Sequence, residues 1–219
     1  MTGDTSTAGE FVSALRSHAP RYGVRLSEQD VSRLRDYYEH VNAWNARLHL
    51  VAPCSPTEFA TRHVLESLLA LPHLTPGARV ADVGSGAGLP IIPCVILRPD
   101  IHATLIEAST KKAIFLREAL RRLGAHNTAS VIAERFERTA APDADFITCR
   151  ALERFAEMFA KLVAWSPHTS TLLLFGGQTL NEQIKKANLD HTIVHIPESE
   201  RRFLFIVKRN KAGTKQLDA

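Results

Sequence analysis

The hydrophobic pattern divides the chain into a helical first third and an alternating remainder. Before residue 78, apolar residues recur at the three-to-four spacing that predicts amphipathic helices. Three segments have this spacing: Phe11–Ala19, a stretch that starts at Ser27 and contains Val31, Leu34, Tyr38 and Val41, and a stretch from Ser55 to Leu71. In the last of these, Ser55, Pro56 and Glu58 have the residue types of an N-cap, a first-turn proline and a capping-box acid. The first ten residues are small and polar, so we expect them to be frayed.

From residue 78 onward, short apolar runs alternate with helical segments. The runs that read as strands are Arg79–Val83, Ala103–Glu107, Ser130–Ala133, Asp145–Thr148, Thr171–Phe175, Thr192–Ile196 and Phe203–Val207. The helices between them are predicted at Pro90–Leu97, from a cap at Ser109 to Gly124, near Leu152–Trp165 and at Thr179–Asn188. This alternation predicts an α/β fold with a mostly parallel, twisted sheet and helices on both faces. The last two strands have no helix between them, so we expect a hairpin at the sheet edge.

The length of 219 residues suits one α/β domain with an N-terminal helical extension. We place the extension at residues 1–77, the α/β domain at 78–210 and a basic tail at 211–219. No apolar run is long enough for a membrane span, and the polar start has no apolar segment typical of a secretory signal. The three cysteines are far apart and match no zinc spacing, which favours buried thiols in the reducing cytoplasm.

A glycine-rich loop follows the first predicted strand, in the run Asp82–Pro90, which reads Asp-Val-Gly-Ser-Gly-Ala-Gly-Leu-Pro. Glycines at a strand–helix turn let the backbone bend sharply and let a ligand approach closely. The spacing G-x-G-x-G differs from the G-x-G-x-x-G of dinucleotide-binding proteins, and the Gly-Lys-Ser/Thr ending of a phosphate-binding P-loop is absent. Gly84, Ser85 and Gly86 are therefore candidate ligand contacts, although a tight turn alone would also use glycines.

An acid follows at the end of the second strand, because Glu107 lies 23 residues after Gly84. A carboxylate there can accept hydrogen bonds from both ribose hydroxyls of a nucleoside. The loop and Glu107 together predict an adenosine-type ligand at the carboxyl edge of the sheet. The alternative for Glu107 alone is an exposed helix cap.

Positive charge gathers in two clusters on a chain whose formal net charge is only +4. The stretch Lys111–Arg122 holds five basic residues and one acid, and residues 201–219 hold six basic residues and one acid. Clusters of this kind on an otherwise acidic body are typical of a surface that binds a polyanion. Solvated helix faces and a solvated tail are the alternative.

Several segments resemble one family, the RsmG (GidB) methyltransferases. They are Asp82–Pro90 with Pro93 and Arg98–Pro99, Asn42–Asn45 with Leu48–Leu50, Arg62–Ser67, Lys111–Arg117, and Cys149–Leu152. The resemblance implies a Rossmann-like class I methyltransferase fold and S-adenosylmethionine as the cofactor. It also implies methylation of N7 of a guanine in bacterial 16S ribosomal RNA, with that RNA or the small ribosomal subunit as the partner.

By position, the resemblance implies cofactor contacts at Gly84, Leu89, Arg135, Phe136 and Arg150. No catalytic residue is assigned, because guanine N7 has a free lone pair and the methyl group of a sulfonium is already activated. We expect no metal, no membrane contact and a monomer. The chain departs from the family pattern at four positions. Ile91 stands where the family has glycine, and Gly176 where it has lysine. Cys149 stands where the family has serine, and Glu66 where it has aspartate.

Two side chains allow more than one interpretation. His63 is a candidate polar group on the N-terminal helices, or a histidine hydrogen-bonded between helix and sheet. Arg150 is a candidate ligand contact after a strand, or one half of a surface ion pair, for example with Glu153. Two other functions also stay open, a small-molecule methyltransferase and a non-catalytic RNA- or nucleotide-binding protein with a degenerate site.

Overall fold

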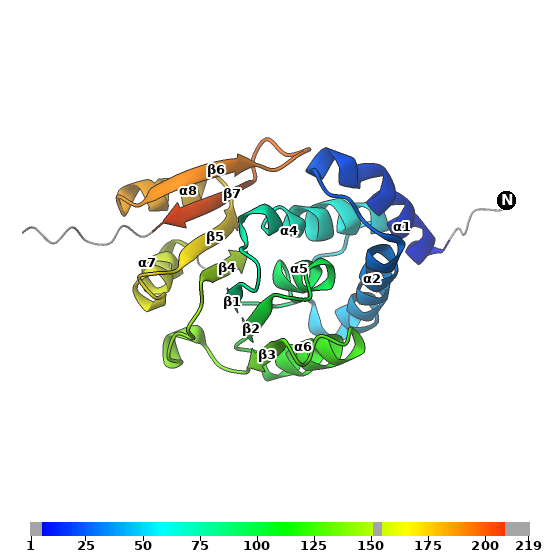
Figure 1. Cartoon of the computed structure of the whole chain (residues 1–219), viewed down its shortest axis with the longest axis horizontal. Helices are drawn as coiled ribbons and strands as arrows, with labels where there is room; N and C mark the ends of the chain where they lie inside the picture. Colours follow the sequence, from blue (N-terminus) through cyan, green and yellow to red (C-terminus); the bar gives the residue numbers. More distant parts are fainter. Residues whose placement is uncertain (1–5, 151–154, 209–219) are drawn as a thin grey trace, which may run out of the picture.

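The computed structural model describes residues 6–150 and 155–208 of the chain. Helices form its first third, as Figure 1 shows in blue and cyan. Their bounds are α1 (Thr7–His18), η1 (Ala19–Tyr22), α2 (Glu28–Leu48), α3 (Pro56–Glu58), η2 (Phe59–Leu65), α4 (Glu66–Leu68) and η3 (Leu71–His73). The expected fraying is wrong for residues 7–10, because the Ser6 side chain caps α1 by accepting a hydrogen bond from the Gly9 amide.

A mixed seven-stranded sheet follows in the part of the chain that the structure describes, with the order β3-β2-β1-β4-β5-β7-β6. Its strands are β1 (Arg79–Val83), β2 (His102–Ile106), β3 (Ala129–Ile132), β4 (Phe146–Arg150), β5 (Thr171–Gly176), β6 (Asp190–His195) and β7 (Phe203–Lys208). The first five strands are parallel, whereas β7 runs antiparallel to β5 and to β6. The predicted parallel sheet and its edge hairpin are confirmed.

Two apolar layers cover the two faces of this sheet. On one face, the N-terminal helices, α5 (Ile91–Leu97) and α6 (Thr110–Arg122) pack on side chains such as Val80 and Leu105. On the other face, η4 (Phe136–Arg138), α7 (Phe155–Trp165) and α8 (Gln178–Lys186) pack on alternate residues such as Ala81 and Ile147. The fold is therefore the predicted α/β, Rossmann-like arrangement. Residues 151–154, where the helix near Leu152 was expected to begin, and 209–219 with the basic tail lie outside the described residues.

The N-terminal helices share one hydrophobic cluster with the sheet. Phe11 of α1, Tyr37 of α2 and Phe59 of η2 belong to the same buried cluster as Val80 of β1. The division of the chain at residues 77 and 78 stays a prediction about folding units. In the described ranges, no helix has both the length and the apolar character that a bilayer span requires.

The third helical segment departs most from the expected regular helix. Ser55 caps it as predicted, since its side chain accepts a hydrogen bond from the Glu58 amide. Glu58 does not close a capping box among the described contacts and instead pairs with Arg62. From Phe59 to Leu65 the backbone is a π-helix, a rare form that often occurs at functional sites. His63 lies within this wide turn, next to the carboxyl edge of the sheet.

Candidate functional site

A cavity of about 660 Å³ opens at the carboxyl end of β1. Strand β1 lies between β2 and β4. Strands β2 and β3 follow on one side of β1, whereas β4 and β5 follow on the other, so the strand order reverses at β1. Parallel α/β sheets bind their ligands at such a switch point, because the following loops part there. The volume lies within the usual range of small-molecule sites, which is roughly 300–1,000 Å³.

The glycine loop forms the floor of the cavity. Gly84 donates its amide to the carbonyl of Ile106 at 2.9 Å, which fixes the loop to the end of β2. Gly86 has a φ of 53°, a conformation that strains any side chain with a Cβ. A Cβ at Gly86 would find nothing closer than the Gly84 carbonyl at 3.8 Å, so the space beside it is open to a ligand.

Glu107 lies against this loop and is 92% buried, because only 8% of its surface is exposed. One carboxylate oxygen accepts a hydrogen bond from the Gly86 amide and the other from the Ser109 amide, each at 2.8 Å. The interpretation of Glu107 as an exposed cap is therefore wrong. Each oxygen keeps a further lone pair, so the carboxylate can still accept hydrogen bonds from a ligand.

A buried carboxyl group lies beneath the loop. Asp82 is completely buried, its Oδ1 accepts a hydrogen bond from the Thr148 hydroxyl at 2.7 Å, and its Oδ2 has no partner in the described chain. Burial raises the pKa of Asp82 to about 7, against the lowering effect of the hydrogen bond from Thr148. Tyr37 supports the same loop from α2 by donating its hydroxyl to the Ala87 carbonyl at 2.8 Å.

The far end of the cavity is formed by the N-terminal helices and β4. His63 lines it together with Val51, and its ring packs against Phe59 at a centroid distance of 5.2 Å. Burial, and then the nearby Arg150 and Arg62 guanidinium groups, lower the pKa of His63 to about 3, so its ring is neutral at physiological pH. Its Nδ1 is buried and has no hydrogen-bond partner among residues 6–150 and 155–208, which contradicts the hydrogen-bonded interpretation.

Arg150 extends from the end of β4 into this polar end. Its Nη2 donates to the carbonyl of Arg62 at 2.5 Å and to Glu66 Oε2 at 3.1 Å. Only 14% of its side chain is exposed. Within the described residues Arg150 therefore forms a buried ion pair, with Glu66, and not a surface one. Glu153, the alternative partner, lies outside the described residues.

All eight residues predicted as contacts line this one cavity. Gly84, Ser85, Gly86, Leu89, Glu107, Arg135, Phe136 and Arg150 come from four separate stretches of sequence. The sequence interpretation missed Lys112, Val51 and Met158, which also line the cavity. Lys112 belongs to a basic cluster and follows the Ser109 cap, which could have placed it at the same edge. Val51 and Met158 are ordinary apolar residues with no such signal.

The family departures lie at different distances from the cavity. Ile91 and Cys149 are fully buried in the core and are absent from the described lining. Gly176 ends β5 at the carboxyl edge of the sheet, and a Cβ there would meet Leu180 Cδ2 at 2.6 Å. Glu66 forms ion pairs with both Arg150 and Arg202.

Residues 30–210 match the sequence profile of one protein family, which is described as GidB, rRNA small subunit methyltransferase G. The chain belongs to this family. Two curated GidB-family members illustrate the likeness. The ribosomal RNA small subunit methyltransferase G of Sorangium cellulosum is 38% identical over 173 residues, covering 76% of this chain and 72% of the relative. That of Acidovorax sp. is 33% identical over 202 residues, covering 86% and 88%.

Solved structures agree with the fold of the GidB-family chain. A SAM-dependent methyltransferase from Aquifex aeolicus has a TM-score of 0.55 at 15% identity, covering 68% of this chain and 92% of its own. The tRNA methyltransferase TrmK of B. subtilis has a TM-score of 0.54 at 15% identity, covering 66% and 65%. At this identity the likeness shows the methyltransferase fold alone.

Proposed function

We propose that this chain transfers the methyl group of S-adenosylmethionine to N7 of a guanine in 16S ribosomal RNA. The observation that carries the proposal is the single cavity in which the glycine loop and Glu107 face the neutral His63 and the buried Arg150. One end of that cavity has the chemistry for a nucleoside, and the other is open to a second reactant at the edge of the sheet.

The residues of the cavity fit the cofactor group by group. Glu107 would accept hydrogen bonds from the ribose hydroxyls, and the open space beside Gly86 would admit the adenosine. Phe136 is almost fully buried and offers an apolar wall, and Arg135 lies beside it. When bound, S-adenosylmethionine supplies a methyl group that a sulfonium has already activated. The task left to the protein is to align the two reactants and to exclude water.

The state of the ionisable groups favours a nucleophile that needs no deprotonation. His63 is a poor proton acceptor at neutral pH because its pKa is lowered to about 3. Glu107 is held by two backbone amides at the loop end of the cavity. Guanine N7 has a free lone pair and releases no proton when it is methylated, whereas an amino group or a hydroxyl must lose one. N7 is therefore the nucleophile that needs no proton acceptor from His63 or Glu107.

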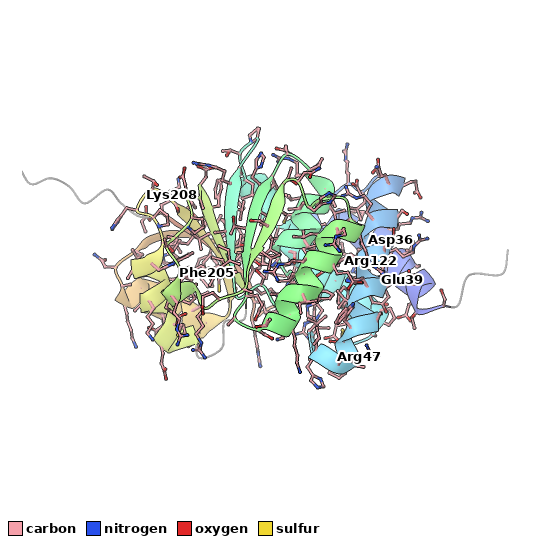
Figure 2. The ribbon with its side chains drawn as sticks, turned by 90° about the horizontal axis from the view of Figure 1, so that it is seen from below. Asp36, Glu39, Arg47, Arg122, Phe205 and Lys208 are labelled. Carbon is pink, nitrogen blue, oxygen red and sulfur yellow. The ribbon has the colours of Figure 1, made fainter. Side chains whose placement is uncertain are left out.

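Within the described residues, each basic cluster is divided between the two edges of the sheet. Helix α6 begins beside the cavity, where Lys112 lines it, and ends at the far edge with Arg121 and Arg122. Figure 2 shows Arg122 near Asp36 and Glu39, and all three line a separate hollow between α2 and α6. Lys208 ends β7 at that same far edge, because β7 runs antiparallel to β5.

Other cations at the carboxyl edge of the sheet would contact the RNA in this proposal. They are Lys111 and Lys112 at the start of α6, Arg135 and Arg138 around η4, and Arg201 before β7. Such cations attract phosphates at long range and orient the RNA, while the cavity selects the base. An unpaired guanine is the form that could enter the cavity.

Two measurements test the proposal. Calorimetry should show binding of S-adenosylmethionine and S-adenosylhomocysteine and no binding of NAD. Radiolabel from the methyl group should then enter the 16S RNA of small ribosomal subunits that lack the modification. Binding of NAD in place of the sulfonium compounds would contradict the cofactor. Cofactor binding without label in subunits or in purified 16S RNA would instead favour a small-molecule substrate.

A further inference from the structure

Glu66 is a buried acid that connects two arginines from distant parts of the chain. Only 1% of its side chain is exposed, although it carries a carboxylate. Its Oε2 lies 3.1 Å from Arg150 Nη2, and its Oε1 accepts hydrogen bonds from Arg202 Nε at 2.9 Å and Nη2 at 2.6 Å. A buried carboxylate with two cationic partners is fixed in position, since its removal would leave both cations without an anion.

The Arg150 guanidinium is held on three sides. Nη2 uses its two N–H groups on the Arg62 carbonyl and on Glu66. The central carbon lies 6.0 Å from the centroid of the Phe175 ring, at the outer limit of a cation–π distance. Nη1 is buried and has no hydrogen-bond partner among the residues that the structure describes. A buried N–H group of this kind is costly unless a ligand accepts from it.

The charges of the cluster are unequal. Arg150 and Arg202 bring two positive charges, and Glu66 brings one negative charge. A further carboxylate could therefore pair with Arg150 where it lines the cavity. S-adenosylmethionine has one anionic group, the carboxylate of its amino-acid part, so its chemistry matches what the cluster lacks.

We propose that Glu66 is a positioning residue that orients Arg150 so that the free Nη1 can donate to the carboxylate of the cofactor. This inference rests on the proposed function, because it needs a cofactor with that carboxylate. Glu66 itself lies outside the cavity lining and acts only through Arg150. Its other oxygen holds Arg202, which comes from the turn before β7, so the two oxygens have separate tasks.

The test compares two ligands that differ in the amino-acid part. S-adenosylhomocysteine has the carboxylate, whereas 5′-methylthioadenosine has the same nucleoside and thioether without it. In Glu66→Gln, the affinity for S-adenosylhomocysteine should fall by about tenfold or more, the loss of a charge-assisted hydrogen bond. The affinity for 5′-methylthioadenosine should stay within about twofold, because its contacts do not involve Arg150.

Two variants serve as controls for charge and for structure. Glu58→Gln removes a half-buried acid that lies about two turns before Glu66 and pairs with Arg62, and both affinities should stay unchanged. Arg202→Met removes the second partner of Glu66 but leaves Oε2 on Arg150, so selective loss of S-adenosylhomocysteine binding should not occur.

A double variant keeps the test decisive if Glu66→Gln does not fold. Arg150→Met removes the unpaired buried cation, so Arg150→Met/Glu66→Gln is the safer protein. If Glu66 acts through Arg150, the double variant should bind S-adenosylhomocysteine no more weakly than Arg150→Met alone. Equal losses for both ligands, unchanged binding of both, or an additive loss in the double variant would overturn the inference. A wild-type protein that binds neither ligand would instead contradict the proposed function.

Discussion

The two edges of the sheet differ in how completely their polar side chains are paired. At the amino edge, Arg79 pairs with Asp143 and Asp145, and Arg98 pairs with Asp100 at 2.7 Å. At the carboxyl edge, by contrast, buried polar atoms lack hydrogen-bond partners within the described ranges. They are Nδ1 of His63, Nη1 of Arg150 and Oδ2 of Asp82, whereas a fourth such atom, Nε2 of His40, lies between α2 and α6.

This difference separates stability from function. Exposed ion pairs such as those at the amino edge add little to stability, but they leave none of their charged groups unpaired. Buried groups without partners cost free energy, and they persist where a ligand completes them. This contrast supports the carboxyl edge as the proposed ligand-binding edge, and the predictions below test that proposal.

The largest effect is expected at the glycine loop. Gly86→Val should abolish binding of S-adenosylhomocysteine, because valine fills the open space beside the backbone and is strained at a φ of 53°. Gly124→Val is the matched control, since Gly124 has a φ of 66° with open space but lies at the end of α6 away from the cavity. Calorimetry should show loss of binding only for Gly86→Val. Normal binding by a folded Gly86→Val protein would remove the loop from the site.

The next effect concerns the acid that holds the loop. Glu107→Ala should weaken S-adenosylhomocysteine binding by about 1–3 kcal/mol, because a charged hydrogen-bond acceptor is lost. Asp100→Ala is a close control at the amino edge, since Asp100 also accepts a hydrogen bond from a glycine amide, that of Gly77 at 2.8 Å. The affinity of Asp100→Ala for S-adenosylhomocysteine should match that of the wild-type protein. Equal affinities in both variants would exclude Glu107 as a ribose contact.

The comparison also shows what sequence can predict. The loop from Gly84 to Gly86 and the acid Glu107 follow from spacing alone, because each ends a parallel strand and such ends meet at one edge. The helix caps predicted at Ser55 and Ser109 are equally local, and both are found. Local chemistry of this kind needs only neighbouring residues.

The other half of the site depends on contacts between distant segments. Glu66 lies 84 residues from Arg150 and 136 residues from Arg202, so no local pattern joins them. The π-helix around His63 has no sequence signal that we identified. Arg202 was placed in a basic cluster for RNA, whereas the structure pairs it with the buried Glu66. Charge along the sequence predicted an anionic partner but not which cations are free to meet it.

A smaller effect is expected from the cations at the two ends of α6. Lys111→Gln/Lys112→Gln should flatten the dependence of log RNA affinity on log salt by about 0.7 for each lost phosphate contact. Arg121→Gln/Arg122→Gln removes the same charge from the far end of α6 and should change the slope little. Filter binding of 16S RNA over a salt series measures both. A greater change in the arginine pair would place the RNA at the opposite edge.

The smallest effect is expected at Gly176, where the family has a lysine. Gly176→Lys adds one cation at the carboxyl edge and should steepen the salt slope by at most about 0.7, one phosphate contact. The new Cβ must also displace the side chain of Leu180, which limits the gain. The same filter-binding series measures this change. A steepening well beyond one contact would show that the existing cations do not substitute for the missing lysine.

The most direct test of the account identifies the atom that receives the methyl group. Small ribosomal subunits lacking the modification are incubated with the protein and S-adenosylmethionine, and the 16S RNA is then reduced and cleaved with aniline, which cuts at 7-methylguanosine. The account predicts a new cleavage at one guanine, absent when S-adenosylhomocysteine replaces the methyl donor. Methyl transfer to another atom of the RNA, without such a cleavage, would contradict it.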